Sequence, residues 1–161
     1  MIDMTVNIIC VGKIKEDYFV KATAEFEKRL SRFCSFNVVC LPDRSIPDNA
    51  SPAEEQIVLK KEGEEILKKI GKSDIVVAMC IEGKQLSSED LSKKLSDISM
   101  TNGTVGFVIG GSWGLSPDVK NRADFKLSVS KMTFPHQLAR LIALEQIYRA
   151  LSINAGSKYH K

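Results

Sequence analysis

The sequence predicts an α/β fold in which helices cover a mostly parallel sheet. Short apolar runs of strand length alternate along the chain with longer segments of helical periodicity. The run DIVVAMCI at 74–81 is apolar on both faces, as a central parallel strand requires. A length of 161 residues suits one compact domain, 1–161, and no repeat, low-complexity segment or linker divides it.

The first half of the chain is predicted to form two strands and two helices. The strands are TVNIICV at 5–11 and FNVVCL at 36–41. Between them, apolar residues recur with a period near 3.6 and predict a helix. These residues are Phe19, Ala22, Phe26, Leu30 and Phe33. After a proline-containing loop, the segment SPAE at 51–54 has the serine, proline and glutamate of a capped helix start, and this helix runs to Gly71.

The second half of the chain continues the alternation of strands and helices. The predicted strands are 74–81, 105–109 and 125–129, and the predicted helices follow a cap at Ser87 or Ser88, begin briefly at Pro117, and span 135 to about 153. Five strands alternating with helices imply helices packed around a mostly parallel sheet.

Charge is distributed unevenly along a chain whose net charge is only +3. Residues 117–161 contain eight basic and three acidic side chains, which gives +5 there and leaves −2 for the other 116 residues. A basic C-terminal third in a near-neutral protein favours a polyanionic partner.

Several classes of protein and site do not fit the sequence. No apolar stretch approaches the roughly 18–20 residues that span a bilayer, and the first residues lack the positive region of a secretion signal, so we expect no membrane contact and a cytoplasmic protein. Cysteines at 10, 34, 40 and 80 have no zinc-ligand spacing. We expect free, buried thiols and no metal site.

The glycine cluster in FVIGGSWG at 107–114 follows a predicted strand and indicates a turn or a ligand loop. It lacks the Lys-Ser/Thr of a phosphate-binding loop and the spacing of a dinucleotide fingerprint. A second loop, SKMTFPHQ at 130–137, also follows a strand. Both are expected at the carboxyl ends of strands, where open α/β sheets bind ligands. For the second loop, an equally good interpretation is that Met132 and Phe134 simply pack under the start of the following helix.

The last predicted helix and the tail contain the remaining candidates. The helix is apolar or small on nearly every side, which predicts that a partner subunit covers one face. Glu145 projects from the apolar arc with Arg149 one turn later, so an i,i+4 ion pair, an interface pair or an active-site network is possible. The tail NAGSKYHK is either frayed or equipped to hold a nucleobase, since it combines aromatic, imidazole and cationic groups.

Taken together, FVIGGSWG, SKMTFPHQLAR, EQIYRA, the terminal YHK and VGKIKEDY near the start closely resemble the RlmH (YbeA-like) family, and the resemblance runs the full length of the chain. The family are SPOUT-class methyltransferases that use S-adenosylmethionine to methylate N3 of a pseudouridine in 23S rRNA. The resemblance implies a homodimer, a C-terminal trefoil knot, and 23S rRNA within the assembled ribosome as substrate.

The resemblance also implies site residues. The cofactor site falls on Met79 (where the family often has leucine), Gly110, Gly111, Val129, Ser130, Lys131, Met132, Thr133 and Phe134. Trp113 is not carried over, because the family varies at that position, and it either shields the cofactor or packs.

For catalysis we expect Tyr159 and His160 to hold the target base over the cofactor of the other subunit. His160 is the better candidate for a base or proton relay, because imidazoles titrate near neutral pH. Arg140 and Arg149 are expected to contact phosphate or join a Glu145 network, and His136 is expected to be structural. Two alternatives remain: a non-catalytic RNA-binding module that needs no cofactor, and an enzyme acting on small nucleotides without RNA.

Overall fold

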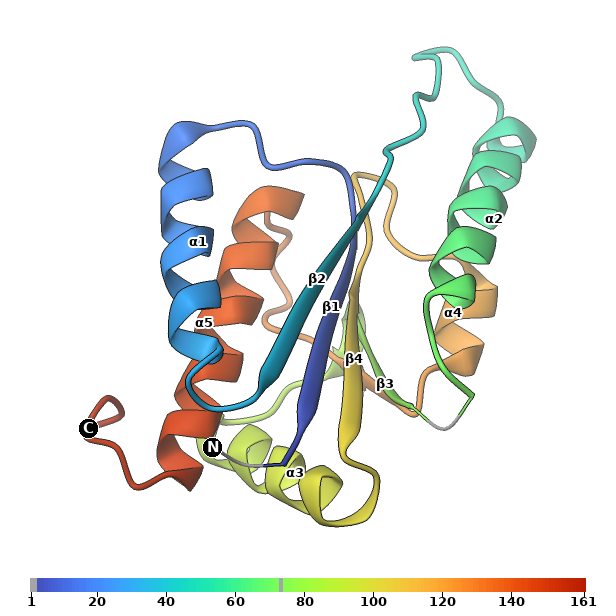
Figure 1. The fold of residues 1–161 in the computed structure, drawn as a ribbon. Coiled ribbons are helices and arrows are strands. Elements are labelled where there is room, and N and C mark those ends of the chain that lie inside the picture. Colours follow the sequence, from blue (N-terminus) through green and yellow to red (C-terminus); the bar gives the residue numbers. More distant parts are fainter. Residues whose placement is uncertain (1–2, 73) are drawn as a thin grey trace.

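The computed structural model describes residues 3–72 and 74–161, and within them the chain forms a five-stranded, all-parallel sheet of order β2-β1-β4-β3-β5 (Figure 1). The strands are β1 (Thr5–Val11), β2 (Ser35–Leu41), β3 (Ile75–Lys84), β4 (Thr104–Ile109) and β5 (Phe125–Leu127), and the helices are α1 (Asp17–Leu30), α2 (Pro52–Lys68), α3 (Ser88–Thr101), α4 (Pro117–Arg122) and α5 (His136–Asn154). The predicted α/β class with a parallel sheet is confirmed.

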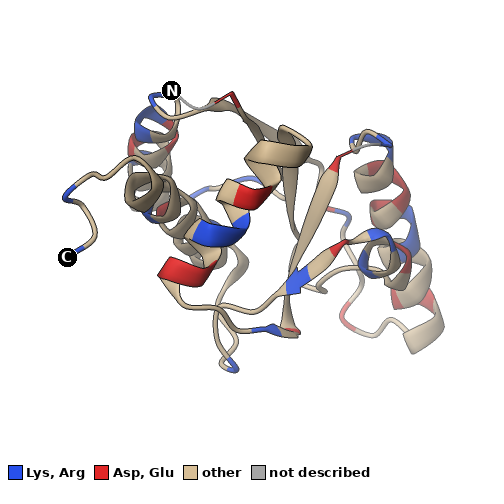
Figure 2. Cartoon of the chain, turned by 90° about the horizontal axis from the view of Figure 1, so that it is seen from below, with Lys and Arg blue, Asp and Glu red and all other residues tan. Residues whose placement is uncertain are grey.

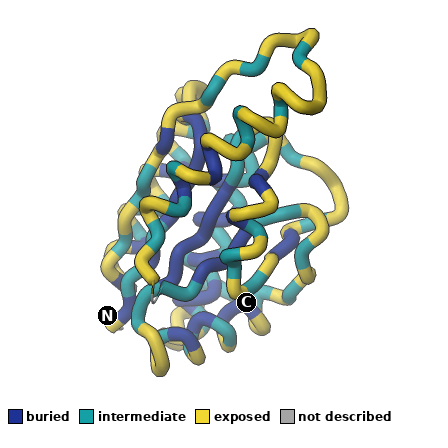
Figure 3. The backbone as a smooth tube through the Cα atoms, turned by 90° about the vertical axis from the view of Figure 1, so that its right-hand side faces the viewer, coloured by how far each residue is buried: buried dark blue, intermediate teal, exposed yellow. Residues whose placement is uncertain are grey.

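Helices cover both faces of the sheet. Alternation along β1 divides the core: Ile8 and Cys10 pack with α1, α3 and α5, whereas Ile9 and Val11 pack with α2 and α4. The same separation is visible in Figure 1, where α1 and α5 lie on one side of the strands and α2 and α4 on the other. The central strands are buried and the outer faces of the helices are exposed (Figure 3).

Helix starts follow the capping signals of the sequence. The Ser51 hydroxyl accepts the Glu54 amide at 3.2 Å, and the Ser87 hydroxyl accepts the Asp90 amide at 3.0 Å. Of the two serines proposed as the cap of the third helix, Ser87 therefore fills that position. Charged residues lie mainly on the helices and loops (Figure 2), and on the strands they are limited to Glu82 and Lys84 of β3 and Lys126 of β5. Among the described residues, no helix is long and apolar enough to cross a bilayer.

Two strands end at other residues than the sequence predicts, and α5 is partly covered within its own chain. β3 continues three residues beyond the predicted end, to Lys84, and β5 stops at Leu127 because the chain then turns into a loop. α5 was expected to need a partner subunit over one face. Within one chain α1 and α3 cover two of its sides and bury Ala143 and Ala150. Side chains in its first half remain partly exposed, including Leu138, Leu141 and Ile142.

The four cysteines are free thiols, as expected, but they are not all buried. Cys10 and Cys34 are buried, and burial raises the pKa of the Cys10 thiol to about 12. Cys40 is exposed because it lies on β2, an edge strand with less cover, and its sulfur is 3.4 Å from that of Cys10.

Candidate functional site

A cavity of about 740 Å³ opens where β3, β4 and β5 end, at the carboxyl edge of the sheet. Its walls are the second half of β3, the glycine loop 110–114 after β4, the loop 128–135 after β5, and the first turn of α5. This is the edge at which open α/β sheets bind ligands. The two loops singled out in the sequence therefore face one another across a single cavity.

Eight of the nine residues that the resemblance assigns to the cofactor line this cavity. They are Met79, Gly110, Gly111, Val129, Ser130, Met132, Thr133 and Phe134. The ninth, Lys131, is exposed and does not line it.

The glycine loop approaches itself too closely for side chains. A Cβ at Gly110 would lie 2.4 Å from the carbonyl oxygen of Gly114, which is backbone and has no room to yield. Gly114 has φ of +79°, and its amide donates to the Gly111 carbonyl at 3.1 Å, closing a tight turn. Because no side chain stands at Gly110 or Gly111, the cavity is bounded there by bare backbone, whose amide and carbonyl groups a ligand can approach.

The second loop is irregular but internally bonded. The Ser128 amide donates to the Lys84 carbonyl at 3.0 Å, and its hydroxyl donates to the Ser130 carbonyl at 2.9 Å. The Ser130 hydroxyl accepts the Met132 amide at 3.0 Å. Met132 is 74% exposed and Phe134 is half-buried on the cavity wall, so these two side chains are not simply tucked under the helix start.

The residues present fit S-adenosylmethionine. The cavity volume lies within the roughly 300–1,000 Å³ of small-molecule sites. Met79, Ile109 and Phe134 provide apolar wall for a purine, and the hydroxyls of Ser130 and Thr133 provide polar groups for a ribose. Among the described residues no cluster of His, Cys, Asp and Glu is arranged to hold a metal ion.

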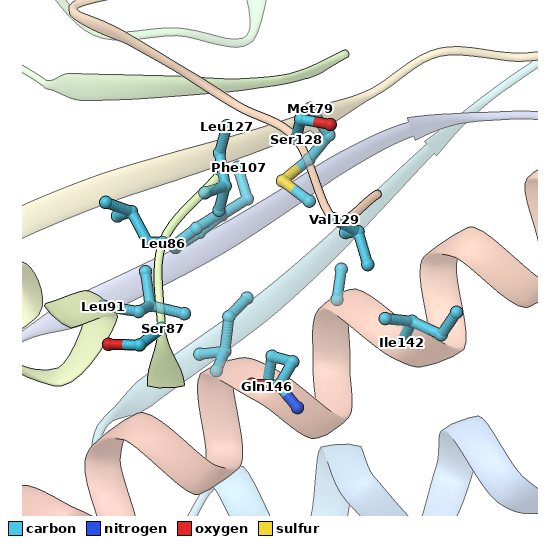
Figure 4. Close-up of a pocket in the computed structure, with 12 residues that line it drawn as sticks. Met79, Leu86, Ser87, Leu91, Phe107, Leu127, Ser128, Val129, Ile142 and Gln146 are labelled. Atoms are coloured by element: carbon cyan, nitrogen blue, oxygen red, sulfur yellow. The ribbon is translucent and has the colours of Figure 1, made fainter. Parts of the chain in front are cut away.

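A smaller cavity of about 200 Å³ adjoins the larger one and shares Met79, Leu127, Ser128 and Val129 with it. Figure 4 shows Met79, Ser128 and Val129 on one side of this space and Ile142 and Gln146 of α5 on the other. It extends the apolar space from the sheet edge toward the middle of α5.

The tail forms an ordered network with α5 and α3 instead of fraying. Glu145 pairs with Arg149 at 2.5 Å and accepts the Tyr159 hydroxyl at 3.1 Å. One His160 nitrogen lies 3.2 Å from the Arg149 guanidinium, and the other lies 2.8 Å from the Glu89 carboxylate. Burial, followed by the Glu145 charge, raises the pKa of the Tyr159 phenol. Four of the five expected catalytic and supporting residues are thus in contact.

Arg140 is the exception, and its expected role is corrected by its position. It is 4% exposed and donates to the carbonyls of Gly12 at 2.7 Å and Val11 at 3.4 Å. It contacts neither Glu145 nor open solvent where a phosphate could bind. The sequence placed it near Arg149 on the same helix, but its side chain points toward the end of β1.

Within one chain the tail and the large cavity lie apart. Pro135, His136 and Ala139 at the start of α5 line the cavity, while the tail docks on Glu145 and Arg149. The helical rise of about 1.5 Å per residue puts roughly 14 Å between His136 and Glu145 along the axis. None of the tail residues lines the cavity.

Sequence reasoning missed part of the cavity wall. Glu82 and Lys120 both line it and form an ion pair at 2.5 Å, which lowers the pKa of the Glu82 carboxyl. Glu82 reaches Lys120 because β3 continues beyond its apolar run to Lys84, and no pattern in the sequence predicts this extension. His136, expected to be structural, also lines the cavity.

Comparisons with known proteins cover almost the whole chain. A family model described as "Predicted SPOUT methyltransferase" matches residues 4–160. A protein named "Ribosomal RNA large subunit methyltransferase H" from Clostridium novyi (strain NT) is 52% identical over 159 residues, which is 98% of this chain and 100% of the relative. Proteins of the same name from Clostridioides difficile (strain 630) and Streptococcus equi subsp. zooepidemicus are 51% and 49% identical with the same coverage. Both cavity loops and the tail network lie within the matched region.

Proposed function

The chain belongs to the RlmH family of SPOUT methyltransferases, and from this premise we propose that it methylates N3 of a pseudouridine in 23S rRNA with S-adenosylmethionine. The observation that carries the proposal is the cavity at the carboxyl edge of the sheet, which gathers eight of the nine expected cofactor residues. The trefoil knot that the resemblance implies belongs to the same proposal.

The cavity loops hold the cofactor in this proposal. Bare backbone at Gly110 and Gly111, together with the hydroxyls of Ser130 and Thr133, would bind its polar groups, and Met79 and Phe134 would contact the adenine. When bound, S-adenosylmethionine supplies a methyl group that is already electrophilic on a sulfonium. The protein then has to position the base and accept the N3 proton.

Tyr159 and His160 are the side chains proposed to hold the target base. Their distance from the cavity of their own chain supports a homodimer in which the tail of one subunit completes the cavity of the other. Arg149 and Glu145 would orient the tail, since they bond both of its rings. We assign His160 as proton acceptor or relay and Glu145 and Arg149 as positioning residues.

RNA binding has to make the target base accessible to the cofactor. A base within folded RNA has to be unstacked before methylation, which costs a few kcal/mol, and lysine–phosphate contacts from the basic C-terminal third offset part of this cost. We propose the assembled ribosome in the cytoplasm as the setting.

The decisive test is mass spectrometry of 23S rRNA from a strain that lacks this protein. We expect one pseudouridine to lose 14 mass units (one CH₂) and to regain them when the gene is restored. Calorimetric titration with S-adenosylmethionine separates the enzyme from a non-catalytic RNA-binding module. An unchanged 23S rRNA mass spectrum in the deletion strain would contradict the proposal.

A further inference from the structure

Trp113 stands at the tip of a turn that the backbone holds rigidly. Gly111 and Gly114 close this turn through an amide–carbonyl bond of 3.1 Å and an antiparallel bridge. The end of β4 packs closely on the same turn, since a Cβ at Gly110 would lie 2.4 Å from the Gly114 carbonyl oxygen. Ser112 and Trp113, at the tip, are both exposed. The turn therefore presents a large, exposed aromatic ring to its surroundings.

The exposure of this ring is not accounted for by packing. Trp113 is 49% exposed, and among the described residues no other ring or cation stacks on its indole. Its neighbours Ser112 and Gly114 line the large cavity, but Trp113 does not. The indole thus lies outside the cavity, beside its mouth.

Other exposed apolar side chains surround the same mouth. Of eight large apolar residues that the described chain exposes, four are Trp113 and the cavity-lining Ile81, Val129 and Met132. Exposed apolar surface concentrated around a pocket marks a binding surface.

Cationic side chains lie on the two adjoining loops. Lys131 is exposed on the loop that faces the glycine turn across the cavity, and Lys13 and Lys15 are exposed on the loop after β1. That loop lies beside the glycine turn because β1 pairs with β4, and it is tied to α5 by the Lys15 amide, which donates to Gln137 at 3.0 Å. Within the described residues none of the three lysines forms an ion pair with a carboxylate.

We propose that the Trp113 indole stacks on a nucleobase next to the target pseudouridine, while Lys13, Lys15 and Lys131 contact the flanking phosphates. An aromatic ring among unpaired cations is the combination that binds single-stranded nucleic acid. The inference rests on the proposed function, because it assumes an RNA substrate at this mouth. Trp113 is then a positioning residue for RNA and takes no part in methyl transfer itself.

Two other roles for the exposed Trp113 ring are less consistent with the structure. A lid on the cofactor would place the indole on the cavity wall, which it does not line. A contact with a second protein surface would leave the three neighbouring lysines without a role, whereas RNA engages both the ring and the cations.

The kinetic test uses large ribosomal subunits from a strain lacking the protein and compares Trp113→Leu, Trp113→Phe and wild type. We expect Trp113→Leu to raise the KM for the particle about tenfold, the effect of losing one stacked base, with kcat and cofactor affinity nearly unchanged. Trp113→Phe keeps a stacking ring and should recover most of the affinity. Met100→Ala, which removes another exposed apolar side chain, at the end of α3 and away from the cavity, is the control.

Fluorescence of the native protein tests the two alternative roles, a cofactor lid and a protein contact, because Trp113 is the single tryptophan of the chain. Acrylamide should quench its emission in the free protein and equally well after addition of S-adenosylhomocysteine. Protection in the free protein would place the ring in a subunit interface, and protection by S-adenosylhomocysteine would make it a cofactor lid. Either result overturns the inference, as does an unchanged KM for Trp113→Leu when wild type is active. Inactive wild type would instead refute the proposed function itself.

Discussion

At the residue scale, the glycines of the 110–114 loop differ in what they do. Gly114 is required by its positive φ, which side-chain-bearing residues rarely adopt. Gly110 has no such conformation and is required by space, since its missing Cβ lets the Gly114 carbonyl approach. The sequence shows a glycine cluster, but only the folded turn shows that Gly114 is needed for its positive φ and Gly110 for the close backbone approach. Adding a single methyl group at Gly110, by substitution with alanine, therefore tests whether this turn shapes the cavity.

Substituting Gly110→Ala should open this turn. The added Cβ would have to displace backbone at 2.4 Å, and overpacking of this kind costs about 1–3 kcal/mol. We expect the affinity for S-adenosylmethionine to fall roughly tenfold, measured by calorimetry, because a 1.4 kcal/mol loss is one decade in Kd. Gly106→Ala on β4 is the matched control, since its Cβ would make an ordinary 3.9 Å contact with Ile9. Wild-type affinity in Gly110→Ala would show that this turn does not shape the cofactor site.

At the element scale, α5 connects the parts of the site. Its first turn borders the cavity, its second turn buries Arg140 against the end of β1, and Glu145 and Arg149 further along it hold the tail. The sequence predicted the length of this helix and the partnership of Glu145 with Arg149. It did not separate Arg140 from Arg149, because helical spacing gives the direction of a side chain but not which neighbour it meets. That neighbour, the Gly12 carbonyl, is 128 residues away.

Replacing Arg140 should weaken the packing of α5 against the end of β1 and lower the stability of the fold. Arg140→Met removes the donors to the Gly12 and Val11 carbonyls, and leaving buried acceptors unpaired costs about 1–3 kcal/mol each. We expect the free energy of unfolding in urea to drop by about 1–3 kcal/mol, since relief of the buried charge offsets part of the loss. Arg32→Met, at an exposed position after α1, should change it by less than about 0.5 kcal/mol. Equal stability of the two variants would contradict a structural role for Arg140.

At the scale of the whole molecule, the alternation of strands and helices was predictable and the order of the strands was not. Apolar runs identify strands one at a time, but the order β2-β1-β4-β3-β5 depends on pairings between segments distant in sequence. The same limit applies to the site. Motif resemblance brought out Gly110, Ser130 and His160, yet only the folded chain shows that the first two share a cavity while His160 docks elsewhere.

The separation of tail and cavity leads to a prediction about the proposed homodimer. Deleting residues 158–161 should leave dimerisation and cofactor binding intact and abolish methyl transfer, because the cavity loops lie outside the deletion. Gly110→Ala should instead impair the cavity and leave the tail intact. If each tail completes the partner's cavity, one subunit of each kind forms one complete site.

Co-expression with two different affinity tags allows that mixed dimer to be purified and assayed on large ribosomal subunits. We expect about half the wild-type rate, since a symmetric dimer has two equivalent sites and one of them is complete. Homodimers of each variant are assayed in parallel with S-adenosylmethionine well below the wild-type Kd, where the tail deletion should be inactive and Gly110→Ala about tenfold slower than wild type. If the tail instead served its own cavity, it would have to leave Glu145 and Glu89 and cross to the start of α5, and the mixed dimer would be no more active than the two homodimers. The rate of the purified mixed dimer therefore decides which subunit supplies Tyr159 and His160 to each cavity.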